Sequence, residues 1–105
     1  MLNQAVIVGR LVSDPKIKET ENNRKEMIIT LAVPRSYKNK NGEYDTDFID
    51  CKLWNGIAES TTEYCKKGDL LGIKGRIEKW AENDGMVVIA ERVTFLSSKA
   101  PKEEE

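Results

Sequence analysis

The alternation of apolar and polar residues along the chain predicts a protein built mainly of β-strands. Successive side chains of a strand point to opposite faces, so an alternating run has one face for the core and one for solvent. Turn residues separate these runs, as at Ser13-Asp14-Pro15, at Pro34 and at Asn83-Asp84-Gly85. We predict loops at residues 19–25 and 36–46, the second with Tyr37 and Tyr44 near its ends. The predicted strands are residues 4–12, 26–33, 47–54, 70–80 and 86–96.

One segment, residues 55–67, has helical periodicity instead. Its apolar side recurs at the spacing of one helix face and contains Ile57, Ala58, Thr61, Tyr64 and Cys65. We predict that Ile57, Thr61 and Tyr64 are part of the core. Asn55 is suited to the N-cap, and Gly68 to a left-handed position after the helix.

The order of these elements predicts the fold class. Three strands, one helix and two strands match the OB-fold, an all-β, five-stranded Greek-key barrel. Strand number alone would also allow other small barrels, and the position of the helix between the third and fourth strands favours this one. We predict one domain over residues 1–97, followed by a short disordered acidic tail at 98–105.

The third predicted strand has two faces of different character. Ile49, Cys51 and Leu53 form an ordinary core row, whereas the opposite row contains Phe48, Asp50, Lys52 and Trp54. Large rings beside a lysine on a wet face are typical of a surface on which nucleic-acid bases stack.

The fourth predicted strand repeats this arrangement. Leu71, Ile73, Gly75 and Ile77 form its core row, and the outward row contains Lys74, Arg76, Glu78 and Trp80. We therefore predict a platform that stacks bases on Phe48, Trp54 and Trp80 and holds phosphates with Lys52, Lys74 and Arg76. The alternative is structural, since tryptophans also cap barrel ends and pack subunit interfaces.

Composition narrows the class of protein further. The chain has 105 residues, enough for one small core, and no apolar run near the roughly 20 residues that span a bilayer. With no N-terminal signal pattern, a cytoplasmic protein without membrane contact is expected. The net charge is −1, and it becomes +2 without the three C-terminal glutamates. Because the chain is not polybasic, stacking must supply much of any affinity for nucleic acid.

Enzymatic and metal chemistry are not expected. The chain has no histidine, no nucleophile elbow and no phosphate-cradling glycine loop. Its two cysteines, Cys51 and Cys65, lack the spacing of a zinc site and are interpreted as packed thiols. Asp45, Asp47 and Asp50 do not share a strand face. We predict no catalytic residues, no metal and no cofactor.

The chain resembles the bacterial and phage single-stranded DNA-binding proteins. The similarity extends in order from Met1 to Leu96, and no single motif is decisive. The matching stretches are residues 2–11, Asp14-Pro15, Leu31-Ala32-Val33 with Arg35, residues 47–51 with Trp54, Ala58-Glu59, residues 67–70 and Gly75-Arg76-Ile77.

The resemblance implies an OB-fold that binds single-stranded DNA with little sequence preference during replication, recombination and repair, near the nucleoid. It also implies a homotetramer, a dimer of dimers that pairs through the first strands. By motif position the stacking residues are Tyr37, Phe48, Trp54 and Trp80. The predicted phosphate contacts are Arg10, Arg35, Lys52, Lys74 and Arg76.

The C-terminal end departs from the family pattern. Members that act as replication hubs carry a long linker and an acidic tip ending in Pro-Phe, whereas this sequence ends Lys-Ala-Pro-Lys-Glu-Glu-Glu. Recruitment of replication proteins through such a tip is therefore not expected. The short C-terminal end is consistent with a short phage, plasmid or accessory paralogue, or with a truncated chain. Two other functions stay open: an OB-type protein–protein module of a replication-restart assembly, and an RNA chaperone.

Overall fold

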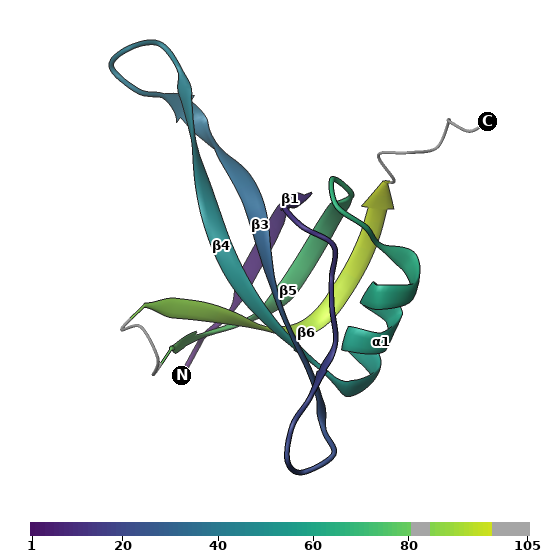
Figure 1. Ribbon diagram of the computed structural model, residues 1–105. Helices are drawn as coiled ribbons and strands as arrows, with labels where there is room; N and C mark the ends of the chain where they lie inside the picture. The colour runs from purple at the N-terminus through teal and green to yellow at the C-terminus, as the bar shows by residue number, and fades with distance from the viewer. Residues whose placement is uncertain (81–84, 98–105) are drawn as a thin grey trace, which may run out of the picture.

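The computed structural model describes residues 1–80 and 85–97 of the chain. Within these residues it contains one helix and six strands (Figure 1). In chain order the elements are β1 (Ala5–Leu11), β2 (Lys18–Glu19), β3 (Lys25–Lys38), β4 (Tyr44–Trp54), α1 (Asn55–Tyr64), β5 (Leu70–Lys79) and β6 (Met86–Ser97).

The strands form a closed barrel. The sheet order is β1-β5-β6-β4-β3-β2, and β1 also pairs with β3 at Arg10↔Ala32 and Leu11↔Leu31, which closes the sheet on itself. Among the strands of the described residues, β4 and β6 alone pair in parallel, and the other pairings are antiparallel. The five long strands with α1 between β4 and β5 are the OB-fold, which confirms the predicted fold class.

The barrel interior is filled by alternate residues of the strands. Burying each large apolar side chain there contributes about 1.5–3 kcal/mol to stability. From α1, Ala58 and Thr61 are fully buried against this core. The large side chains with almost no exposed surface are Leu11, Met27, Leu31, Leu53, Leu71 and Ile73.

The predicted break at Pro34 is wrong, because β3 continues through it to Lys38. Pro34 lies opposite Thr46, and the register shifts between Pro34 and Lys38. A bulge is a place where a strand tolerates a residue without an N–H. The predicted loop 36–46 is therefore mostly two paired strand ends, which form a long arm that projects from the barrel (Figure 1).

Residues 19–25 are also more ordered than predicted. Lys18 and Glu19 of β2 pair with Glu26 and Lys25 at the start of β3, so the segment is a short hairpin rather than a plain loop. Its turn includes Asn23 with φ 61°, a left-handed position that asparagine tolerates. This hairpin adds a short outer edge beside β3.

The helix is shorter than predicted and ends at Tyr64 rather than Lys67. Asn55 is not the N-cap; it has φ 50°, and its Oδ1 accepts a hydrogen bond from the Lys25 backbone N–H at 3.2 Å. Gly68 has the predicted positive φ, 93°, but within the turn that follows the helix.

Two residues predicted for the core are exposed. Tyr64 is 64% exposed, and its ring packs against Phe95 with 5.8 Å between centroids. Ile77 is 43% exposed, because β5 leaves the core beyond Gly75. A Cβ at Gly75 would lie 1.9 Å from the Ile89 carbonyl oxygen, so this close approach requires glycine.

The predicted hairpin between the last two strands is confirmed where it is described. Lys79 pairs with Met86, and the Trp80 backbone N–H donates to the Gly85 carbonyl at 2.7 Å. Asn83 and Asp84 of the predicted turn, and the predicted tail at 98–105, lie outside the described residues.

Candidate nucleic-acid interface

The outward row of β4 lies on the barrel surface beside an outward row of β3. The register places Ile28 opposite Lys52 and Ala32 opposite Phe48. Phe48 is 67% exposed, a large ring held in water by a rigid strand. The predicted two-faced character of this strand is therefore confirmed.

The same face continues across β6 to β5. Lys52 is paired with Ile89 of β6, and Ile89 is paired with Arg76 of β5. Lateral neighbours in a sheet project to one side, and each step between strands is about 4.8 Å. Lys52 and Arg76 therefore belong to one surface, roughly 10 Å apart at the backbone.

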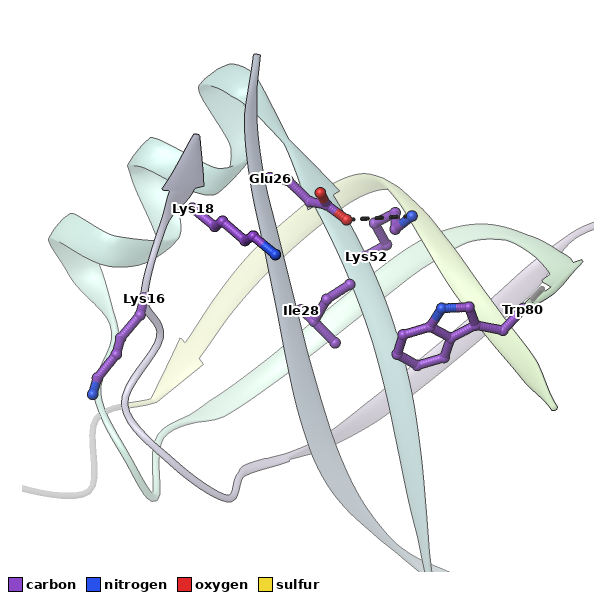
Figure 2. A pocket seen from close by; sticks show the side chains of 6 residues that line it. All are labelled: Lys16, Lys18, Glu26, Ile28, Lys52 and Trp80. Carbon is purple, nitrogen blue, oxygen red and sulfur yellow. Dashed lines mark ion pairs between the residues drawn. The ribbon is translucent and has the colours of Figure 1, made fainter. Parts of the chain in front are cut away.

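A hollow lies on this surface beside Trp80. It is lined by Lys16, Lys18, Glu26, Ile28, Lys52 and Trp80 (Figure 2). The indole of Trp80 stands at one side with Ile28 at the centre, and Lys18 approaches from the other side. Such a space suits a flat group stacked on the indole with an anionic group beside the lysines.

Trp54 lies at the end of β4 and is half-buried. The Arg24 guanidinium lies over its ring, with Cζ 4.5 Å from the centroid, and Lys52 Nζ is 5.2 Å from the same centroid. Both distances are in the range of cation–π attraction. Lys52 therefore connects the two tryptophans, since it also lines the Trp80 hollow.

Tyr37 is not part of this cluster. It lies near the end of β3 on the projecting arm and is 62% exposed. Nine steps from residue to residue along β3 separate it from Ile28, which corresponds to about 30 Å. The structure brings Trp54, Trp80 and Lys52 together and leaves Tyr37 at a distance.

Arg35 on the arm is held by carboxylates. Its Nε and Nη2 donate to the two oxygens of Asp47 at 3.0 and 2.9 Å, and Asp45 lies 3.8 Å from Nη1. This bidentate contact raises the pKa of Arg35 and lowers the pKa of Asp47 below its ordinary value of 3.8. A phosphate would have to compete with Asp47 for this guanidinium.

Arg76 has two carboxylate partners as well. Its Nε donates to Glu78 at 2.9 Å and its Nη1 to Glu91 at 3.1 Å, and the hydrogen bonds to these acids raise the pKa of Arg76.

The other cations predicted to bind phosphate differ in whether they already have a hydrogen-bond or ion-pair partner. Lys52 forms an ion pair with Glu26 at 3.3 Å, and Arg10 Nη1 donates to the Gly68 carbonyl at 3.0 Å. Among the described residues, Lys74 alone of the five predicted cations has no ion-pair or hydrogen-bond partner.

The sequence prediction missed Lys16, Lys18, Arg24 and Ile28 as residues of this face. The outward position of Ile28 followed from its strand parity, since Met27 and Ile29 are the buried neighbours. Arg24 was missed because it lies in the predicted loop 19–25, and Lys16 and Lys18 were missed because no element was predicted for residues 16–18. The Lys16-Ile17-Lys18 alternation was the one signal in the sequence that could have indicated a cationic face.

The two cysteines are free and buried. Removal from water raises the pKa of the Cys51 thiol to about 12 and that of Cys65 to about 11, with smaller contributions from Asp50 and Asp69. Within residues 1–80 and 85–97 no group of three or more His, Cys, Asp or Glu side chains is placed to hold a metal.

Asp45, Asp47 and Asp50 accept hydrogen bonds from three different side chains. Asp45 accepts from Asn39 at 3.0 Å, Asp47 binds Arg35, and Asp50 accepts from the Thr30 hydroxyl at 2.6 Å. In the described part of the chain, no helix has the length and apolarity needed to cross a membrane.

The barrel and its aromatic, cationic face define an OB-fold of the nucleic-acid-binding type. A profile of the Single-strand binding protein family matches residues 2–96. The chain therefore belongs to this family, as the resemblance indicated.

Individual relatives agree with this assignment. The chain is 42% identical to single-stranded DNA-binding protein B of Bacillus subtilis, over 98% of this chain and 96% of that protein. It is 40% identical to single-stranded DNA-binding protein 2 of Listeria monocytogenes, over 94% of this chain and 66% of that protein. It also spans 52% of single-stranded DNA-binding protein 1 of Lactococcus lactis, at 46% identity.

A solved structure has the same fold. A deletion mutant of the single-stranded DNA binding protein from Thermus aquaticus matches with a TM-score of 0.74, over 93% of this chain and 52% of that one. Its sequence identity is 22%, so the likeness concerns the barrel architecture.

Proposed function

We propose that this chain binds single-stranded DNA with little sequence preference and coats it during replication, recombination and repair. The observation that carries the proposal is the continuous outer face on which Lys52 lies beside both tryptophans, in a chain of the Single-strand binding protein family. The binding is assigned to the barrel, residues 1–97, and it involves no catalytic step.

Stacking supplies the sequence-tolerant part of the affinity. Every base has a π-face, and each stacked base contributes about 1–3 kcal/mol by alanine substitution. Trp54, Trp80 and Phe48 offer such surfaces on the barrel, and Tyr37 offers one on the arm. Two or three engaged rings would give a useful affinity without a strongly basic surface, which fits the net charge of −1.

Assembly into a homotetramer is part of the proposal. Within the described residues, β1 pairs with β3 only at Arg10 and Leu11, so the edge from Ala5 to Gly9 is open on that side. Val6 and Val8 of the same strand are 68% and 47% exposed. An open edge with exposed apolar residues favours pairing with the same strand of a second copy.

Tryptophan fluorescence tests the binding. Titration with oligo-dT should quench the emission, because both tryptophans lie on the proposed face, and the binding should weaken with added salt as counterions are released. Trp54→Ala combined with Trp80→Ala should cost about 2–6 kcal/mol of binding if the two stacking contributions add. A folded double variant with the oligo-dT affinity of the unmodified protein would rule out stacking on these rings.

The two alternatives give different titrations. A protein–protein module would show no oligonucleotide-dependent quenching even at low salt. An RNA chaperone would bind oligo-U more tightly than oligo-dU, through contacts to the 2′-hydroxyl. A cytoplasmic location remains a prediction.

A further inference from the structure

We propose that Lys16, Lys18 and Lys67 form a phosphate track that leads the DNA backbone away from Trp80. This inference rests on the proposed function and adds the path of the strand beside the stacking platform. None of these three lysines was among the predicted phosphate contacts.

The first step is the geometry of two neighbouring hollows. Lys16 and Lys18 line the hollow that contains Trp80, and Lys16 also lines a second hollow with Ser13, Asp14 and Lys67. Lys16 and Ile28 line both, so the two hollows adjoin one another. Figure 2 shows Lys18 and Lys16 on the side of the first hollow away from the Trp80 indole, and Lys67 follows at the second hollow.

The second step is the availability of their charges. Within residues 1–80 and 85–97, the ammonium groups of Lys16, Lys18 and Lys67 make no ion pair. A phosphate at these lysines displaces water, whereas a phosphate at a paired arginine must also displace a carboxylate.

The third step concerns the acids that face the path. Two carboxylates line these hollows, and both are engaged. Glu26 is paired with Lys52 at 3.3 Å, and Asp14 accepts the Lys67 backbone N–H at 2.8 Å. The Asp14 contact also fixes the turn after α1 against the loop that carries Lys16, which holds Lys67 at the second hollow.

The stacked base and the track fit one strand of DNA. A base on the Trp80 indole would place its phosphate toward Lys18 and Lys16, on the opposite side of the same hollow. The next nucleotides would then continue past Ile28 toward Lys67. Lysine suits this role because its ammonium is a point charge that tolerates a moving backbone.

The salt dependence of binding tests the track. Each phosphate neutralised on a single strand adds about 0.7 to the slope of log affinity against log salt. Lys16→Ala with Lys18→Ala should lower the slope by about 1.4, and adding Lys67→Ala should lower it by about 2.1 in total. Between 50 and 200 mM salt, the unmodified protein should then lose about 7-fold more affinity than the double variant.

Two further variants serve as controls. Lys66→Ala removes a positive charge next to Lys67 that lines neither hollow, and it should keep the original slope, whereas Lys67→Ala should lower the slope by about 0.7. Lys16→Arg with Lys18→Arg keeps both positive charges, so the slope of log affinity against log salt should also be unchanged. Tryptophan quenching at saturation should persist in the alanine double variant, because the rings are intact.

The outcomes separate the track from the function. An unchanged slope in the Lys16→Ala, Lys18→Ala variant, or a fall in slope for Lys66→Ala equal to that for Lys67→Ala, would overturn the track while leaving DNA binding in place. Failure of the unmodified protein to bind oligo-dT at low salt would overturn the proposed function itself.

Discussion

The arm and the Trp80 hollow are two regions with similar residues and different electrostatics. On the arm, Arg35 and Tyr37 lie beside Asp45 and Asp47, and the guanidinium is held bidentately by Asp47. At the hollow, Trp80 faces Lys16 and Lys18, neither of which makes an ion pair among the described residues. An aromatic with a nearby cation is therefore not a sufficient description of a binding site.

The difference lies in what each cation already binds. Arg35 orders the arm by linking β3 to β4, and it would give up two hydrogen bonds to reach a phosphate. Lys16 and Lys18 would give up only hydration, whereas Lys52 at the same hollow is paired with Glu26. Net charge does not reveal this distinction, because it counts both kinds of cation equally.

The largest expected effect on DNA binding comes from removing the ring of Trp80 at the hollow, which we compare with removing the ring of Tyr37 on the arm. Trp80→Ala should cost about 1–3 kcal/mol of binding to a short oligo-dT, since its indole lines the hollow. Tyr37→Ala should leave short oligonucleotides unaffected and weaken only longer ones, because about 30 Å of strand separates it from Ile28. Fluorescence titration with a series of lengths measures both. Equal losses on the shortest oligonucleotide would show that the arm and the hollow form a single site.

A smaller effect should follow from releasing Arg35. Asp47→Asn removes the charge that holds the guanidinium, so a phosphate could take its place. The salt slope of oligo-dT binding should become steeper by about 0.7. Asp45→Asn is the matched control, since Asp45 lies farther from Arg35, at 3.8 Å, and should change the slope less. An identical slope for Asp47→Asn and the unmodified protein would mean that Arg35 takes no part in binding even when free.

The smallest effect is the pH response of the arm. The hydrogen bonds from Arg35 lower the pKa of Asp47 in the folded protein. The ion pair between Asp47 and Arg35 is therefore fully formed above pH 3.8, and it is lost as the pH falls through the lowered pKa of Asp47. NMR signals of the Tyr37 ring should therefore be constant from pH 7 to about 5 and change only below about 4. In Asp47→Asn the same signals should lack this transition. A change near pH 6 would require a different group.

Much of the barrel was predictable because strand alternation is a local property. Leu53 and Leu71 fall in buried rows by parity alone, and their neighbours Lys52 and Gly72 do not. The outward position of Phe48 and Lys52 followed from the same parity. Predictions were wrong where a contact distant in sequence outweighed a local signal. At Pro34 the sequence predicted the end of a strand, but β3 continues because its register shifts next to Pro34, where a backbone N–H is not required.

Two other errors have the same origin. The helical periodicity extended past Tyr64, but the chain turns there because the Lys66 backbone N–H donates to Asp69 and the Lys67 N–H donates to Asp14, 53 residues away. Ile77 matched the core row, yet β5 leaves the barrel interior beyond Gly75. In each case one of the contacts comes from a residue remote in sequence, Asp14 at the end of the helix and Ile89 at Gly75.

The sequence by itself determined the order of the five barrel strands along the chain, the helix between the third and fourth of them and the outward position of Phe48. These depend on side-chain alternation, turn residues and element order, which are local. Only the tertiary structure decided which cations are available. Arg35 and Arg76 share their charge with carboxylates placed by strand pairing, whereas Lys16 and Lys67 line one hollow, where the Lys67 backbone N–H donates to Asp14. Charge pairing across strands depends on register and on barrel closure, and no local pattern contains that information.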